Sequence, residues 1–245
     1  MSPAAPDMRP DVLPLTLQGI TLHRGGQRLL GPVDWVLAGA GLSAVIGPNG
    51  AGKSTLLRLM HGLERPSAGR LHWAVPTEAA RRAQAFVFQS PVVLRRSLAD
   101  NLAFPLRLAG MPRADQRARA LDWAARLGLA DRVDRPAGVL SRGERQKLAL
   151  ARALITEPSV LFLDEPTASL DGHATAAIEA MLLAERARGT RIVLATHDMG
   201  QARRLADEVV FLLGGRIHET GPAAPFFAAP QTEAAAAFLR GDIVT

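Results

Sequence analysis

The stretch GPNGAGKST at residues 47–55 decides the fold. It matches the pattern G-x-x-x-x-G-K-[ST], in which glycines let successive backbone N–H groups turn inward around phosphates. Lys53 is one of only two lysines, and its compact ammonium reaches between phosphates where a broad guanidinium does not. Ser54 supplies the hydroxyl that ligates Mg²⁺ in this pattern. The predicted nucleotide-binding residues are Gly47, Pro48, Asn49, Gly50, Ala51, Gly52, Lys53, Ser54 and Thr55.

The segments that flank this loop support the interpretation. An apolar strand at residues 42–46 precedes it, and residues 55–60 have the pattern of a helix, whose positive dipole end would face the phosphates. The alternative is a glycine-rich turn before an ordinary helix. A chance match has a probability on the order of 0.001 in this composition, so we favour a phosphate-binding loop.

Length and composition indicate one globular domain. The chain has 245 residues, of which 48% are hydrophobic, and a mean hydropathy of +0.08. No apolar run approaches the roughly 18 residues that span a bilayer, and residues 1–14 lack the hydrophobic block of a signal peptide. We therefore expect a cytoplasmic protein with a disordered, proline-rich segment at residues 1–13 and one domain at residues 14–245. Zero cysteines exclude disulfides and thiolate metal sites.

A net charge of +6 would suit an anionic partner such as nucleic acid or a membrane surface. However, the arginines are dispersed along predicted helices, and aromatic residues make up only 4% of the chain. No basic and aromatic residues interleave as in a base-stacking platform. We expect solvated helix faces and no nucleic-acid partner.

Hydrophobic periodicity predicts an α/β fold. Beyond residue 157, strands alternate with helices, which indicates a parallel sheet wrapped by helices. Residues 97–157 show only helical periodicity, so we expect an inserted α-helical subdomain at about residues 90–157. Residues 63–84 are turn-rich and stay unassigned. Strands are predicted at residues 15–22, 31–37, 42–46, 85–88, 160–163 and 192–195, a hairpin at 208–219, and helices at 174–188 and 200–206.

Two adjacent carboxylates, Asp164 and Glu165, follow the apolar strand at residues 160–163. Burying such a pair is costly unless a charged group occupies that end of the strand, and a Mg²⁺–nucleotide complex supplies that group. Ligands of open α/β sheets bind at the carboxyl ends of strands. Asp164 is therefore predicted to hold Mg²⁺, and Glu165 to deprotonate the attacking water. The alternative is a capping pair before Pro166.

Two further positions allow two interpretations each. His197 ends an apolar strand, where a lone histidine is more often structural than catalytic. Ser141 begins a helical stretch and is followed three residues later by Glu144, which is the spacing of a capping box. The exposed N–H groups of the same helix start also suit a phosphate.

In this order, the motifs resemble those of the ATP-binding subunits of ABC transporters, over about residues 15–227. Residues 47–55 are similar to the Walker A loop, and Asp164 with Glu165 to the Walker B motif and its catalytic glutamate. Residues 140–144 are similar to the signature motif. The remaining matches are Gln89 with the Q-loop glutamine, residues 169–171 with the D-loop and His197 with the switch histidine.

The resemblance implies a P-loop NTPase fold, in which the parallel sheet is joined by an antiparallel β subdomain and the inserted helices. The implied cofactors are ATP and Mg²⁺. Two copies of the chain would enclose two ATP molecules. The implied roles are catalysis by Lys53, Gln89, Glu165 and His197, Mg²⁺ binding by Ser54, Gln89 and Asp164, and nucleotide contacts from Ser141, Gly143 and Asp171.

The resemblance also implies membrane-spanning permease subunits, which would hold the chain at the inner face of the membrane, and indirectly a substrate-binding protein. Residues 91–98 are the expected contact with the permease. Residues 94–102 and 221–227 most resemble importers of tungstate-type oxyanions. Alternatives are phosphate, molybdate or amino-acid importers, an exporter, or a non-transport ABC ATPase, although the long heptad insertion of the DNA-repair members is absent.

Two positions depart from the family pattern. The signature motif usually reads LSGGQ, whereas this chain has Arg142 and Glu144 at the third and fifth places. Family members stack an aromatic residue on adenine just before a Gly-Gly turn, and here Arg24 occupies that place. We expect Arg24, or with less support His23, to stack on the base through its planar group.

Overall fold

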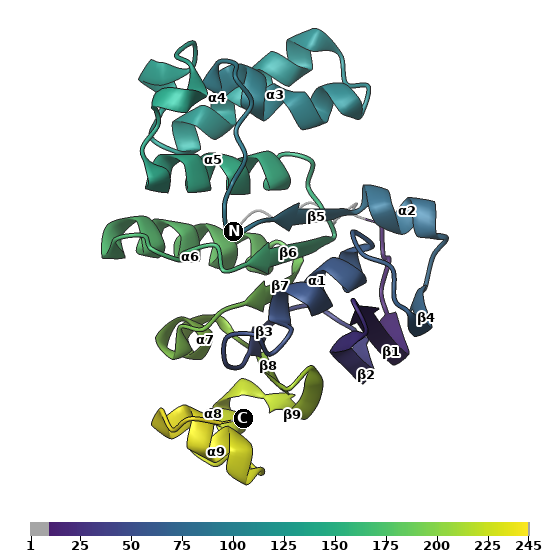
Figure 1. The fold of residues 1–245 in the computed structure, drawn as a ribbon. Helices are drawn as coiled ribbons and strands as arrows, with labels where there is room; N and C mark the ends of the chain where they lie inside the picture. The colour runs from purple at the N-terminus through teal and green to yellow at the C-terminus, as the bar shows by residue number, and fades with distance from the viewer. Residues whose placement is uncertain (1–9, 245) are drawn as a thin grey trace, which may run out of the picture. The chain divides into compact units, whose positions relative to one another are not determined.

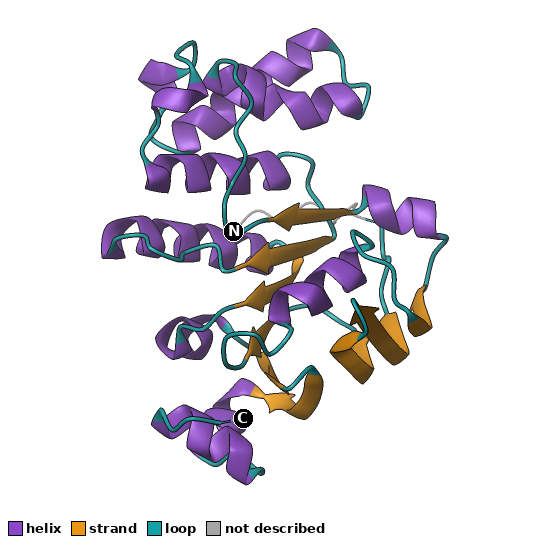
Figure 2. Cartoon of the chain, viewed as in Figure 1, coloured by secondary structure: helices purple, strands orange, loops and turns teal. Residues whose placement is uncertain are grey.

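The computed structural model describes residues 10–244, and its central element is a six-stranded sheet (Figures 1 and 2). Strands β6, β7, β3 and β8 run parallel, and β9 pairs antiparallel with β8 at one edge. The strand order is β5-β6-β7-β3-β8-β9. The bounds are β3 Leu42–Ile46, β5 Gln84–Val87, β6 Val160–Asp164, β7 Arg191–Ala195, β8 Glu208–Leu213 and β9 Arg216–Pro222.

The parallel strands form because they are apolar on both faces. Every residue of β3, β6 and β7 is buried, as expected where helices or a second sheet cover both faces of a sheet. The predicted parallel α/β sheet is therefore confirmed. Helices α6, Gly172–Ala187, and α7, Met199–Leu205, follow β6 and β7 in the chain.

A second, antiparallel sheet contains β1, Leu15–Arg24, β2, Gln27–Leu37, and β4, Ala68–Trp73, in the order β2-β1-β4. Gly25 and Gly26 join β1 to β2 with φ angles of 58° and 77°, which a tight hairpin turn requires. Residues 63–84, unassigned from sequence, contain β4 and helix α2, Thr77–Arg82. Strand β4 is mostly exposed, so it lacks apolar alternation and forms through pairing with β1.

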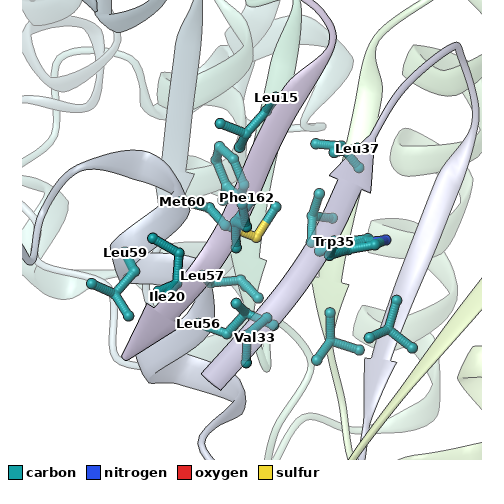
Figure 3. Packing of buried hydrophobic residues seen from close by; sticks show 14 of the residues in the cluster. Leu15, Ile20, Val33, Trp35, Leu37, Leu56, Leu57, Leu59, Met60 and Phe162 are labelled. Carbon is teal, nitrogen blue, oxygen red and sulfur yellow. The ribbon is translucent and has the colours of Figure 1, made fainter. Parts of the chain in front are cut away.

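The main core lies where the antiparallel sheet meets helix α1, Lys53–His61, and strand β6 (Figure 3). Apolar side chains from β1 and β2 point toward one face of α1, and Phe162 of β6 completes the cluster. Burying this face of α1 fixes the helix that follows the phosphate-binding loop. The labelled members are Leu15, Ile20, Val33, Trp35, Leu37, Leu56, Leu57, Leu59, Met60 and Phe162.

The chain divides into two compact units, which we describe separately. The first contains both sheets and extends through Phe86, with Ser159–Glu165 and the chain from Leu183 onward. The second comprises Val87–Pro158 and Pro166–Leu182. It contains helices α3, Leu98–Leu108, α4, Arg113–Arg126, and α5, Arg142–Leu154, with the short 3-10 turns Ala130–Arg132 and Ala137–Val139 and the first part of α6.

Two terminal segments differ from the sequence expectations. Of the segment expected to be disordered, residues 1–9 lie outside the described residues, whereas Val12 is 1% exposed because it fills the core. After β9, the chain forms α8, Ala223–Ala228, and α9, Glu233–Arg240, which were not predicted. Within residues 10–244, no helix combines the length and apolar character that crossing a membrane requires.

Candidate functional site

The phosphate-binding loop lies between β3 and α1, as the sequence predicts. Gly47, Gly50 and Gly52 have φ angles of 149°, 80° and 100°, which side chains with a Cβ rarely adopt. A Cβ at Gly47 would lie 2.0 Å from the carbonyl oxygen of Leu212. The glycines are therefore required both for the turn and for its close approach to β8.

Lys53 is enclosed by the loop that it follows. Its Nζ donates hydrogen bonds to the carbonyl oxygens of Gly47, at 2.8 Å, and Pro48, at 3.0 Å, and the residue is only 6% exposed. Burial lowers the pKa of Lys53, while the charges of Glu165 and Asp164 raise it. A cation held inside a glycine-rich loop fits the phosphates of ATP.

Asp164 and Ser54 meet at the carboxyl end of β6. The Ser54 hydroxyl donates to Asp164 Oδ1 at 2.7 Å, and Asp164 is 3% exposed. Burial raises the pKa of Asp164, against the Ser54 hydrogen bond and the charge of Arg58, whose Nη2 lies 3.7 Å from Oδ2. A hydroxyl and a carboxylate form a set of oxygen donors that fits Mg²⁺.

Arg58 is a residue of this site that the sequence interpretation did not single out. It lies four residues after Ser54 on α1, so both side chains lie on one face of the helix. That spacing is the signal that would have identified it.

Glu165 and His197 come together from neighbouring strands. The Glu165 backbone has a φ of 46°, and its N–H donates to the Ala195 carbonyl at 2.9 Å. His197 Nδ1 lies 3.2 Å from Glu165 Oε2. Left-handed backbone is uncommon for a glutamate and persists where its surroundings enforce it, often at functional sites. The backbone of Glu165 is therefore held by β7, and its carboxylate is contacted by His197.

The second unit contains residues 140–144, which resemble the signature motif and are called the signature-like residues below. Ser141 and Glu144 form the complete capping box of α5, with hydrogen bonds of 3.2 and 2.8 Å. Glu144 also accepts from Arg132 Nη1 at 2.8 Å, and hydrogen bonding to the Ser141 backbone is the main cause that lowers the pKa of Glu144. Glu144, which replaces the usual glutamine of the signature motif, thus has a structural role at the start of α5.

Three other predicted residues have the following places. Gln89 is exposed and follows β5 by two residues. Asp171 Oδ1 accepts from the Ala174 N–H at 2.7 Å at the start of α6. Arg24 Nη2 donates to Glu64 Oε1 at 3.1 Å, and its side chain is 67% exposed. Their contacts with nucleotide stay predictions.

In the first unit, the structure thus brings together a buried lysine, a hydroxyl, two carboxylates and a histidine at the carboxyl ends of parallel strands. This is the site of a P-loop nucleotide-binding protein. A family model described as "ABC transporter" matches residues 30–168, more than half of the chain. The chain belongs to this family as an ATP-binding subunit, and it is an ATPase.

Similar proteins include import subunits. A probable anion import ATP-binding protein of Haloferax volcanii is 35% identical over 99% of this chain and 92% of its own length. The methionine import ATP-binding protein MetN of Bradyrhizobium diazoefficiens is 40% identical over 89% of this chain. The chain spans 66% of that MetN protein, about two thirds of its length.

Two solved structures share the fold. The ATP binding subunit of an ABC transporter has a TM-score of 0.80 at 26% identity, over 93% of this chain and 100% of that one. The second, cbiO1 from Clostridium perfringens, part of the ABC transporter complex cbiONQ, has a TM-score of 0.78 at 27% identity, over 94% and 96% of the two chains. The predicted P-loop fold is confirmed.

Proposed function

We propose that the chain is the ATP-hydrolysing subunit of a membrane importer and that it acts as a pair of identical copies. The observation that carries this proposal is the cluster of Lys53, Asp164, Glu165 and His197 in one unit. Support for import comes from relatives named as anion and methionine import proteins. In the pair, the phosphate loop of each copy faces Ser141 and Gly143 of the other, as the family resemblance implies.

The chemistry assigned to these residues is the transfer of the γ-phosphoryl group to water. Lys53 and the loop N–H groups bind the phosphates. Glu165 accepts a proton from the attacking water as its oxygen bonds to phosphorus, and the bond to the ADP oxygen breaks. His197 holds the Glu165 carboxylate in position. Mg²⁺, when bound through Ser54 and Asp164, neutralises phosphate charge, and Gln89 and Asp171 keep the roles that the resemblance implies.

The proposed partners are permease subunits in the cell membrane, which hold the chain at the cytoplasmic face and contact residues 91–98. A subunit of a larger transporter complex among the structural neighbours supports this arrangement. A substrate-binding protein would act indirectly, through the permease.

For the transported substrate, we propose an oxyanion of the tungstate type. The alignment with the anion import protein covers nearly the whole chain, which supports an anion. Methionine is the second candidate, because several MetN proteins are 37–41% identical to this chain.

The test is stimulation of ATP hydrolysis in the transporter purified with its membrane subunits and binding protein. Tungstate, molybdate, phosphate and methionine are added one at a time. We expect stimulation by tungstate and none by methionine. Stimulation by methionine alone would assign the transporter to amino-acid import. If none of the four compounds stimulated ATP hydrolysis, the result would contradict the importer proposal.

A further inference from the structure

The segment at residues 92–97 in the second unit has no regular secondary structure, yet it is firmly held. The buried side chain of Asn101, on α3, accepts a hydrogen bond from the Leu94 N–H at 2.8 Å. Its Nδ2 lies within hydrogen-bond distance of three carbonyl oxygens, those of Leu94, Arg96 and Ser97, at 3.1, 3.4 and 2.9 Å. The segment is therefore a preorganised surface rather than a loose connection.

Backbone hydrogen bonds fasten the other side of this segment. The Ala137 N–H donates to the Arg96 carbonyl at 2.9 Å, and the Leu98 N–H donates to the Arg135 carbonyl at 3.0 Å. The segment nevertheless presents Val92, which is 72% exposed, to solvent. The segment is thus accessible at Val92 and hydrogen-bonded to its neighbours in the same unit.

One of those elements is α5, through Arg152. Arg152 Nη2 donates to the Val92 carbonyl oxygen at 2.7 Å. Among residues 10–244, no carboxylate forms an ion pair with this partly buried guanidinium, and burial lowers the pKa of Arg152. Lacking an acidic partner, Arg152 is directed at the backbone of the segment.

The opposite end of α5 carries Ser141 and Gly143. Arg152 lies eleven positions after Ser141, which corresponds to about 16 Å of helix. The complete capping box fixes the start of this helix, and the helix packs against α3. One continuous helix thus joins Ser141 and Gly143 at its start to the bond with Val92 near its other end.

We infer that Arg152 is a positioning residue that couples residues 92–97 to the start of α5, so that displacement of this segment by a partner reorients Ser141 and Gly143. The inference rests on the proposed function, in which a permease contacts residues 91–98 and the signature-like residues meet the ATP of the second copy. It assigns the mechanical link to one side chain, Arg152.

The test compares the wild type, Arg152→Met, Arg152→Lys and the control Arg119→Met. Arg119 has a single exposed ion pair, with Glu157, in the same unit, and it does not touch residues 92–97. ATP hydrolysis is measured for the chain alone and for the transporter purified with its membrane subunits and substrate-loaded binding protein.

For Arg152→Met, we expect the activity of the chain alone to stay within about 2-fold of wild type, whereas stimulation by loaded binding protein falls at least about 5-fold. Arg152→Lys keeps a donor and restores part of the stimulation, and Arg119→Met matches wild type in both measurements. Equal losses in both preparations, or full stimulation in Arg152→Met, would overturn the inference.

A second measurement separates this inference from the proposed function. Hydrogen exchange of the chain alone needs no permease. Arg152→Met should raise exchange in residues 92–97 and also in residues 141–144, relative to Arg119→Met. Faster exchange in the first segment with no change in the second would show that the two are not coupled, whatever the transporter carries.

Discussion

Both ends of the six-stranded sheet carry buried charged side chains, but different groups compensate these charges at the two ends. At the amino ends of β7 and β8, Arg191 Nη2 donates to Ser43 Oγ at 2.6 Å and to Glu208 Oε2 at 3.1 Å, and Ser43 donates to the same carboxylate. Opposite charges there are paired directly, although the buried Nε of Arg191 has no hydrogen-bond partner among the described residues.

At the carboxyl ends of β3, β6 and β7, the charges are close but poorly paired. Lys53 bonds two carbonyl oxygens rather than a carboxylate, and the nearest basic group to Asp164 is Arg58 at 3.7 Å. Burial raises the pKa of Asp164 and lowers that of Lys53. The comparison teaches that neutral groups make the short hydrogen bonds to the buried charges at the carboxyl ends, whereas an opposite charge does so at the amino ends. We call these the functional end and the structural end of the sheet.

The largest expected effect is that of Lys53→Ala at the functional end. Removing the ammonium should weaken ATP binding and lower hydrolysis at least about 10²-fold, because the lost charge acts on the β- and γ-phosphates. Nucleotide titration and steady-state phosphate release measure both effects. The control is Arg82→Ala, an exposed position with one weak ion pair, and near-normal turnover in Lys53→Ala would refute the assignment.

Glu165→Gln tests the carboxylate as a base. The amide keeps the shape but loses the proton acceptor, so single-turnover hydrolysis should fall about 10²-fold while ATP stays bound, and a Mg²⁺- and ATP-dependent dimer should accumulate. Quenched-flow and light scattering measure these effects. Glu208→Gln, the same change at the structural end, should not slow the chemistry. Hydrolysis by Glu165→Gln at the wild-type rate would remove Glu165 from the catalytic role.

Arg191→Met tests the structural end. The guanidinium is 5% exposed and Glu208 is 31% exposed, so its removal leaves a partly buried carboxylate without its partner. We expect the free energy of unfolding to fall by about 2 kcal/mol. Urea denaturation measures this loss, and the affinity for ATP should not change. If Arg191→Met lost affinity for ATP and kept its free energy of unfolding, Arg191 would not have the structural role assigned to it here.

Asp164→Asn should show the opposite sign of effect on stability. Because the folded-state pKa of Asp164 is raised, its ionised form destabilises the nucleotide-free protein above that pKa. The variant should therefore be more stable by about 1 kcal/mol at pH 7, while hydrolysis is lost. The gain should decrease as the pH falls below the folded-state pKa of Asp164 and vanish below its ordinary pKa of 3.8. Denaturation at pH 7 and pH 4 checks both, and a destabilised variant at pH 7 would contradict the argument.

Local patterns predicted the parts of the site that depend on neighbouring residues. The loop at residues 47–55 and the capping box of Ser141 were predictable because their hydrogen bonds join residues only three to six positions apart. The strands β3, β6 and β7 were predictable because burial on both faces requires continuous apolar runs. Strand β4 and helices α8 and α9 were missed, since pairing with distant strands and packing on β9 determine them.

The sequence by itself predicted which residues carry the chemistry: Lys53, Ser54, Asp164 and Glu165 from local motifs, and His197 from the family resemblance that those motifs support. Only the tertiary structure decided how they are combined. Ser54 and Asp164 are 110 residues apart, and Arg191 and Ser43 are 148 apart, so sheet topology alone brings each pair into contact. The fold also decides whether the short hydrogen bonds to a buried charge come from neutral groups or from an opposite charge, and spacing along the chain does not encode that.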